Sequence, residues 1–382
     1  MYGRFFLLVT LGFLLGWTPL VPASDLLPSR NKIDGWLNKL GANSRFDTNK
    51  TVDWGVIPGP FYTPELGLGL GAAVAGIYRP DKSNSQTQNS TISLSGYVGA
   101  RGAVGITVQN YSFLADDDWR FFLDGSLNNT PTYYWGQGFS AGKHNGNKQR
   151  YTSREFTLRP ELFRKIAPAL WAGVGLSFAS EHAARIENKG TGPLVYAAGG
   201  ASTDNVGASL SVDYDTRDFV PNPRHGQMAR LRYTHYSPEM GGNARFDEYE
   251  ARYGLYRSIA ANSVLAWEVD GHFTQGDVPW TLLPALGGDR RMRGYYEGRY
   301  RDRNVVSSQL EYRRKLDWRH GIVGWIGSGT MSERMSKLGA GEWLPSMGVG
   351  YRFEFKPRMN VRLDYGIGKR SSGFYFQVGE AF

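Results

Sequence analysis

Side chains along most of this chain alternate between apolar and polar with a period of two residues, in segments of about ten residues separated by turn residues. The clearest segment is Val264–Phe273, in which Leu265 and Trp267 fall on one face and Glu268 and Asp270 on the other. Successive side chains of an extended strand point to opposite faces. The pattern therefore predicts an all-β protein whose strands separate an apolar environment from an aqueous one.

The pattern yields sixteen candidate strands. They lie at residues 66–78, 90–100, 103–111, 118–126, 132–141, 152–163, 170–180, 204–216, 226–236, 246–257, 263–273, 304–314, 320–329, 346–356, 359–367 and 373–382. In a soluble sandwich the apolar face of each strand would be the core, so alternation alone leaves a sandwich and a membrane barrel open.

Three further features favour a barrel in an outer membrane. Single-chain bacterial barrels have an even number of strands, joined alternately by short turns and long loops. Here short turns such as Lys356–Arg358 alternate with long polar loops such as Glu181–Thr203 and Gln275–Arg303. The 22 Tyr and 11 Trp residues suit aromatic girdles at the two interfaces. We therefore predict a 16-stranded antiparallel transmembrane β-barrel over residues 56–382, in the outer membrane of a Gram-negative-type cell.

The N-terminal residues predict export. Arg4 precedes an apolar run over 5–17, which is shorter than the ~20 residues of a spanning helix. We expect residues 1–23 to be a secretory signal peptide, the alternative being an uncleaved anchor. Residues 24–55 then form a short periplasmic arm, with a helix-like patch at Ile33–Leu40.

The charge of the chain is basic but evenly spread. The formal net charge is +9, and Lys and Arg are interleaved with Asp and Glu, so we expect no nucleic-acid partner. A polar barrel interior, and loops facing anionic outer-membrane lipid and lipopolysaccharide, explain the charge equally well. The chain has no Cys, and its residues suggest no metal and no cofactor.

Enzymatic chemistry is not expected. None of the six His residues lies in a Gly-x-Ser-x-Gly context, and there is no His-Glu-x-x-His or phosphate-binding loop. The remaining enzyme alternative is a hydrolase with its Ser and His on the lipid face, which a phospholipase assay would detect.

Three carboxylates lie close together in Asp213–Asp218, before the turn at Pro221–Pro223. A calcium-binding loop spaces its oxygen ligands more widely and regularly. We therefore expect a salt-bridge cluster that locks this turn, with metal binding as the alternative.

One loop, Leu286–Asp302, carries an Arg-Gly-aromatic tip. Four marks follow one another along the chain: Asp213–Asp218 with Pro223 and Gly226, then Arg293-Gly294-Tyr295, then Arg362–Gly366, and the ending Gly379–Phe382. With these marks, and with five strands after the loop, the chain resembles the BamA/TamA family of bacterial surface antigen barrels over about residues 55–382.

The resemblance implies a place for the tip. In that family the extracellular loop folds back into the lumen, and its Arg pairs with acidic and aromatic groups on the inner wall. Here this implies that Arg293 binds Asp364, with Glu354 as a second candidate, and both carboxylates fall on the polar faces of their strands. Gly294 would let the tip turn sharply. The alternative is that Arg293 is a solvated loop cation.

The last strand carries an expected assembly signal. Family recognition reads a Gly followed by aromatic or apolar residues at alternating positions, which Gly373, Phe376 and Val378 match, and Phe382 would add an exposed apolar terminus. The alternative is a lipid-facing closing strand without a signal.

The resemblance also implies a function: assisting the insertion, assembly or translocation of proteins, or of lipid, through a weak seam between the first and last strands. Glycines in the strands expected at the seam would weaken it, or would mark only close packing. They are Gly67, Gly69, Gly71, Gly76, Gly373 and Gly379. The rival interpretation is a passive channel or structural barrel plugged by its own loop.

Full-length family members place periplasmic POTRA domains before the barrel, whereas this chain has only residues 24–55 there. It resembles a POTRA-less branch, so we expect it to borrow any periplasmic partner. Its client and that partner are unknown.

Overall fold

The computed structural model describes residues 30–42, 46–47, 49–63, 66–81, 87–188 and 190–382. The expected signal peptide, residues 1–23, lies outside the described residues. Among the described helices, none is long and apolar enough to cross a membrane.

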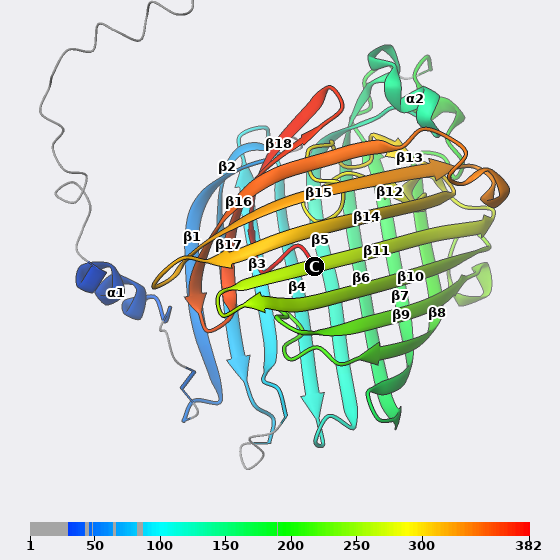
Figure 1. The fold of residues 1–382 in the computed structure, drawn as a ribbon. Coiled ribbons are helices and arrows are strands. Elements are labelled where there is room, and N and C mark those ends of the chain that lie inside the picture. The colour runs from blue at the N-terminus through cyan, green and yellow to red at the C-terminus, as the bar shows by residue number, and fades with distance from the viewer. Residues whose placement is uncertain (1–29, 43–45, 48, 64–65, 82–86, 189) are drawn as a thin grey trace, which may run out of the picture.

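Sixteen strands form one antiparallel sheet in which each strand pairs with the next along the chain. They are β1 (Val52–Thr63), β2 (Gly67–Tyr78), β3 (Ser90–Gly99), β4 (Val104–Leu114), β5 (Trp119–Tyr134), β6 (Gln149–Ala167), β7 (Leu170–Ala184), β8 (Ser202–Asp215), β9 (Gly226–Tyr236), β10 (Phe246–Ala260), β11 (Ser263–Gly276), β14 (Asn304–Lys315), β15 (His320–Ser332), β16 (Leu344–Lys356), β17 (Met359–Gly368) and β18 (Ser371–Val378). Figure 1 shows this sheet curving round until its first and last strands approach each other.

The remaining elements lie outside the sheet. A small ladder of β12 (Ala285–Leu286) with β13 (Tyr300–Arg301) belongs to the long loop between β11 and β14. The helix α2 (Phe139–Lys143) lies among the loops, and α1 (Arg30–Lys39) lies beside the barrel (Figure 1). The helix expected near Ile33–Leu40 is thus confirmed.

Alternation in β8 shows why these residues form a barrel wall. Leu210 and Val212 are 61% and 46% exposed, whereas Ser211 and Asp213 between and beside them are buried. Apolar side chains outside and polar ones inside reverse the order of a soluble protein, as hydrocarbon outside the ring requires. The predicted fold class, an all-β sixteen-stranded antiparallel barrel, is confirmed.

One strand was missed and one expected strand does not exist, so the count of sixteen is unchanged. The first strand is β1, inside and beyond the segment expected to be an arm. Pro58 and Pro60 hide it, because proline argues against a strand except at an edge. Conversely, the separate strand expected at 132–141 does not exist: β5 runs on to Tyr134, and α2 follows at Phe139.

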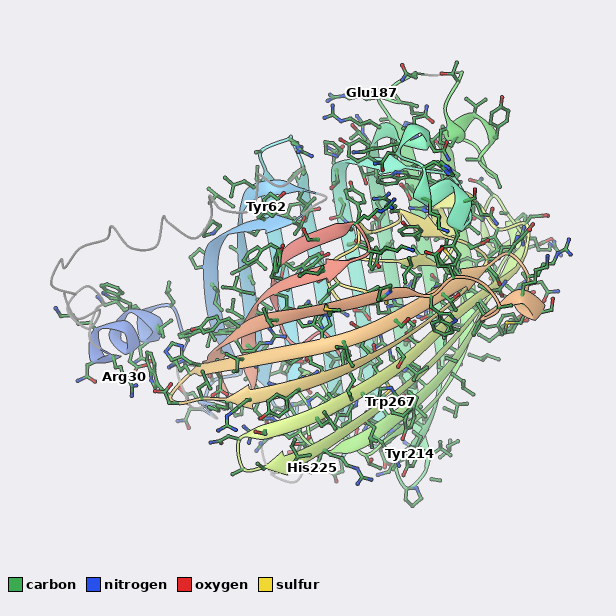
Figure 2. All side chains as sticks on the ribbon, turned by 45° about the horizontal axis from the view of Figure 1, so that its top comes forward. Arg30, Tyr62, Glu187, Tyr214, His225 and Trp267 are labelled. Carbon is green, nitrogen blue, oxygen red and sulfur yellow. The ribbon has the colours of Figure 1, made fainter. Side chains whose placement is uncertain are left out.

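The two ends of the barrel differ. Glu187 lies among the long loops at one end, and Tyr214 and His225 flank the short turn between β8 and β9 at the other (Figure 2). Aromatic side chains of strands and loops pack together at the loop end, where Trp280 contacts Tyr134 and Tyr151. The short-turn end faces the periplasm in barrels of this kind.

The last strand ends earlier than expected. β18 stops at Val378, and Gly379 has a φ of +91°, which turns the final residues away from the sheet. The carbonyl oxygen of Phe382 accepts a hydrogen bond from Arg313 of β14 at 2.6 Å, and the C-terminus lies within the outline of the barrel (Figure 1). Phe382 is half-buried, so the expectation of an exposed apolar terminus was wrong.

Candidate functional site

Arg293, at the tip of the long loop, is completely buried between three strands. Its guanidinium donates to Asp364 of β17 and to Glu311 of β14, at 2.6 Å each. It also lies 3.6 Å from the ring centroid of Trp325 in β15. Two carboxylates and an aromatic face therefore surround one cation, an arrangement that suits the planar guanidinium and not a lysine.

Glycines on both sides allow the close approach of the tip to β17. Gly294 has a φ of +107°, and a Cβ there would lie 2.7 Å from the carbonyl carbon of Ile367. On the strand, a Cβ at Gly366 would lie 2.7 Å from the carbonyl carbon of Arg293, and one at Gly368 would overlap the Tyr295 ring. The backbone of the loop is therefore packed directly on the backbone of the wall.

Hydrogen bonds hold the rest of the tip. The amide of Gly294 donates to the hydroxyl of Tyr375 in β18 at 3.0 Å, and Ser346 donates to the carbonyl oxygen of Arg293 at 2.6 Å. The hydroxyl of Tyr295 donates to the carbonyl oxygen of Pro345 at 2.6 Å and accepts from the amide of Lys369 at 2.7 Å. The tip thus contacts β14 to β18 together.

The charges around the tip balance. Asp364 also accepts from Arg352 at 2.5 Å and Arg362 at 3.2 Å, and Glu311 accepts from Arg313 at 2.7 Å. Four guanidinium groups face four carboxylates in this network: Arg293, Arg313, Arg352 and Arg362 with Asp289, Glu311, Asp364 and Glu380. Buried charges are tolerated only when paired in this way.

Glu354 is not a partner of the tip. It pairs with Lys315 at 3.2 Å, close to the short turns, whereas the tip contacts the opposite half of β16 at Ser346. Its place is taken by Glu311, which sequence reasoning missed. The signal was available, since Glu311 falls on the polar face of 304–314, but nothing in the sequence shows that β14 and β17 flank the same loop.

The residues of the expected assembly signal lie along the closing strand. Gly373 is buried opposite Gly366 of β17, while Phe376 and Val378 pack on an apolar cluster with Ile57 of β1. A role of these residues in assembly stays a prediction, as does the absence of enzymatic activity.

The Asp213–Asp218 segment forms the salt-bridge cluster expected from the sequence. Asp215 accepts from Arg120 and from Arg217, at 3.0 and 2.9 Å, and Asp213 accepts from Arg230 at 2.6 Å. These bonds tie the end of β8 to β5 and β9.

Asp218, in the turn that follows, is held by bonds across the short-turn end. Burial alone would raise the pKa of Asp218. Hydrogen bonds from the amides of Arg224 and His225 and the guanidinium of Arg358 outweigh burial, so its pKa lies below its usual value.

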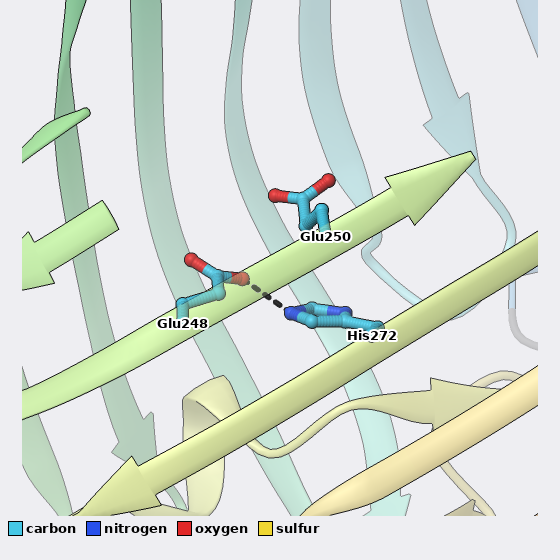
Figure 3. Close-up of side chains that lie close together, drawn as sticks. All are labelled: Glu248, Glu250 and His272. Atoms are coloured by element: carbon cyan, nitrogen blue, oxygen red, sulfur yellow. Dashed lines mark hydrogen bonds and ion pairs between the residues drawn. The ribbon is translucent and has the colours of Figure 1, made fainter. Parts of the chain in front are cut away.

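Glu248, Glu250 and His272 form the one group among the described residues with the geometry of a metal site (Figure 3). His272 already pairs with Glu248, as the dashed line in Figure 3 shows, and Tyr236 donates to Glu248 at 3.0 Å. Glu250 lies 3.6 Å from a nitrogen of Arg159 and 3.9 Å from one of Arg232. A cation would meet these two guanidinium groups, so we assign the group to the ion-pair network of the wall.

The seam between β1 and β18 differs from every other junction. Consecutive barrel strands are joined by backbone ladders, but among the described residues no ladder joins β1 to β18. The ring of Phe376 lies close to the backbone of Gly59 in β1, where a Cβ would be 3.4 Å from the ring, and Ile57 of β1 packs on the same apolar cluster as Phe376 and Val378. The expected seam glycines Gly67, Gly69, Gly71 and Gly76 belong to β2, so that part of the prediction was wrong.

Fold and site together define an outer-membrane barrel whose long loop is bound to the wall through an Arg-Gly-aromatic tip. The Omp85 superfamily domain matches residues 85–382, which is more than half of the chain, and the protein therefore belongs to the Omp85 superfamily. This confirms the family resemblance and the outer-membrane location. A search of curated protein sequences finds no match.

Solved structures agree on the fold. BamA from Haemophilus ducreyi lacking POTRA domains 1–3 is similar with a TM-score of 0.53 and 13% identity, over 91% of this chain and 77% of that one. CdiB from Acinetobacter baumannii (0.55, 11%) and CdiB from Escherichia coli (0.56, 12%) are each similar over 87% of this chain. This chain covers 60% and 63% of the two CdiB chains, less than two thirds of their length.

Proposed function

We propose that this protein assists the insertion, assembly or translocation of polypeptides at the outer membrane, through a lateral seam between β1 and β18. The observation that carries the proposal is the absence of a backbone ladder between these two strands among the described residues. Separating two paired strands breaks a row of hydrogen bonds in a medium without water, at several kcal/mol per unsatisfied group. A seam held by side chains opens at a far lower cost.

The sequence of β1 supports the proposal. Pro58 and Pro60 carry no amide hydrogen, so this strand offers fewer donors to a neighbour on its free edge. Such an edge resists permanent closure yet leaves carbonyl oxygens available to a client strand.

Contacts at the short-turn end hold the seam together. Asp53 of β1 and Lys356 of β16 form an ion pair of 3.0 Å, with both side chains fully buried. Nearby, Asp34 of α1 pairs with Arg319 at 3.2 Å, beyond the end of β14. The first strand and the helix before it are thus tied to β16 and to the turn between β14 and β15, and we infer that these ties regulate opening.

The arrangement of the long loop favours polypeptide transport over a permanently open pore. In this proposal the segment 287–299 occupies the lumen and is pinned at Arg293, so that water and small solutes are retained while a client engages the seam. The ion pairs that fix the tip reach β14, β16, β17 and, through Glu380, the end of the chain. Movement of the seam and movement of the tip are therefore coupled mechanically.

A passive channel is the second candidate, because cavities of about 370 and 390 Å³ remain beside the loop. Both are lined by Tyr97, Thr157 and Asp289, and arginines line them as well: Arg301 in the first cavity, and Arg290 and Arg362 in the second. Polar cavities of this size admit water and small solutes.

Locking the seam tests the proposal. The chain has no Cys, so Gly59→Cys with Phe376→Cys can be linked by a short bis-thiosulfonate reagent and released by reductant. In proteoliposomes, we expect the linked protein to stop inserting a small unfolded outer-membrane barrel, and reduction to restore insertion. The control is Leu94→Cys with Val108→Cys, which face each other within the β3–β4 ladder. Full activity of the locked seam would overturn the proposal.

A further inference from the structure

The outer face of the barrel carries an apolar hollow of about 530 Å³ over β11 and β14 to β17. Among its lining residues are Leu310, Tyr312, Ile326, Met347 and Val349. These belong to the exposed face of their strands, which faces hydrocarbon: Val349 is 65% exposed. The hollow therefore lies on the membrane side of the wall, across the sheet from the loop tip.

A glycine makes the floor of this hollow. Gly324 lies between Ile322 and Ile326 on the outer face of β15, and a Cβ there would meet nothing within 4 Å. In the sheet register it lies opposite Tyr312 on one side and Val349 on the other. A missing side chain amid large ones opens a depression in an otherwise even surface.

Two exposed arginines lie just beyond one end of the hollow. Arg314 lies two residues beyond Tyr312 on the exposed face of β14, and Arg257 is exposed on β10, opposite Leu265. Leu265 in turn lies opposite Tyr312. Among the described residues, no carboxylate forms an ion pair with either arginine. Both residues are near the short turns, at the level of the periplasmic headgroups.

Tyr312 joins the two parts. Its side chain lines the hollow, and its hydroxyl lies 3.1 Å from the hydroxyl of Ser263, at the polar end. An amphipathic tyrosine at this level is typical of a membrane interface.

We propose that this surface binds one anionic phospholipid of the periplasmic leaflet, with its phosphate on Arg257 and Arg314 and an acyl chain over Gly324. Moving an acyl chain from bilayer to hollow exchanges hydrocarbon for hydrocarbon, so the hydrophobic effect does not select the lipid. Selection comes from shape and from the charge-assisted bonds of two guanidinium groups to a phosphate. The site is independent of the proposed seam.

Native mass spectrometry of the whole, delipidated protein tests the site. Phosphatidylglycerol and phosphatidylethanolamine with identical acyl chains are titrated separately. We expect one phosphatidylglycerol to be retained in preference, and the double variant Arg257→Gln with Arg314→Gln to weaken it on the order of tenfold, as two lost charge-assisted bonds allow. Gly324→Leu, which fills the floor, should weaken retention of both lipids.

Matched variants provide the controls. Gly96→Leu alters another open glycine, in β3, where the nearest atom to a Cβ is 3.8 Å away, and Arg164→Gln removes an exposed arginine elsewhere. Both should retain phosphatidylglycerol as the unaltered protein does. Equal retention by all variants, or loss with the arginines but not with Gly324→Leu, would overturn the site and leave only annular lipid or general attraction. Preference for lipopolysaccharide over phosphatidylglycerol would also overturn it.

Discussion

Arg293 illustrates how one side chain can hold a long loop in place. It satisfies Asp364 and Glu311 from different strands and stacks on Trp325, so its removal leaves two strands without a shared partner. Because Glu311 also binds Arg293, exchanging the charges of Arg293 and Asp364 would place a carboxylate beside Glu311. We therefore expect that the double exchange does not restore the stability of the barrel.

Arg293→Met is expected to lower the free energy of unfolding by about 3 kcal/mol. Loss of one buried partner costs ~3–5 kcal/mol, and Arg352 and Arg313 still compensate the two carboxylates. Urea unfolding followed by tryptophan fluorescence measures the change. Arg290→Met, at an exposed position of the same loop, is the control, and an equal effect of both variants would contradict the role of the tip.

Asp218→Asn should make the free energy of unfolding depend less on pH in the acidic range. The pKa of Asp218 is lower in the folded protein than in the unfolded chain, so its carboxylate stabilises the fold above the unfolded value, about 4, and this contribution is lost as the pH falls through the folded pKa. Unfolding midpoints of the two proteins should therefore differ at pH 7 and converge in acid. A constant difference at all pH values would contradict this.

At the scale of elements, β1 and α1 decide the character of the barrel. A strand with two prolines ends the sheet, and ion pairs tie this strand to β16 and the helix before it to the turn between β14 and β15. The two edge strands approach each other without a backbone ladder among the described residues, and the proposed opening of the seam depends on this condition.

Lys356→Met is expected to loosen this junction. It leaves the buried carboxylate of Asp53 with Lys50, 3.4 Å away, as its one ion-pair partner among the described residues, and so costs stability. Compared with the unaltered protein, the variant should show faster backbone hydrogen exchange in β1, with a smaller change in β4. Adding Asp53→Leu should recover much of the stability, because an apolar pair can replace a buried ion pair. Unchanged exchange in β1 would show that the ion pair does not hold the seam.

At the scale of the whole molecule, a polar inner face and an apolar outer face together require the sheet to curve into a nearly closed barrel. The tip packs against β14 to β18, while the two cavities are lined by residues of β1 to β8, of β17 and β18 and of the long loop. The surroundings of the tip are thus rich in paired charges, whereas hydroxyl and amide groups are the commonest polar groups around the cavities.

Conductance in planar bilayers distinguishes a plugged transporter from a channel. We expect small, rare openings from the unaltered protein, because the loop is fixed by buried ion pairs, and large steady openings after deletion of residues 288–298. Large steady openings of the unaltered protein would favour the passive channel.

Much of the fold was predictable because the period-two pattern is a local property of the chain. β9 was expected at the bounds that the structure shows, and most other strands within a few residues. β1 escaped because its prolines contradict a strand in isolation and are tolerated only at the seam, which does not exist until the ring closes.

The sequence alone determined which side chains face hydrocarbon and which face the interior, since that choice depends only on alternation along each strand. Only the tertiary structure decided which strands meet at the seam and that Glu311 and Trp325 join Asp364 around Arg293. Those neighbours lie on separate strands, and their proximity follows from ring closure and register, which no local pattern contains.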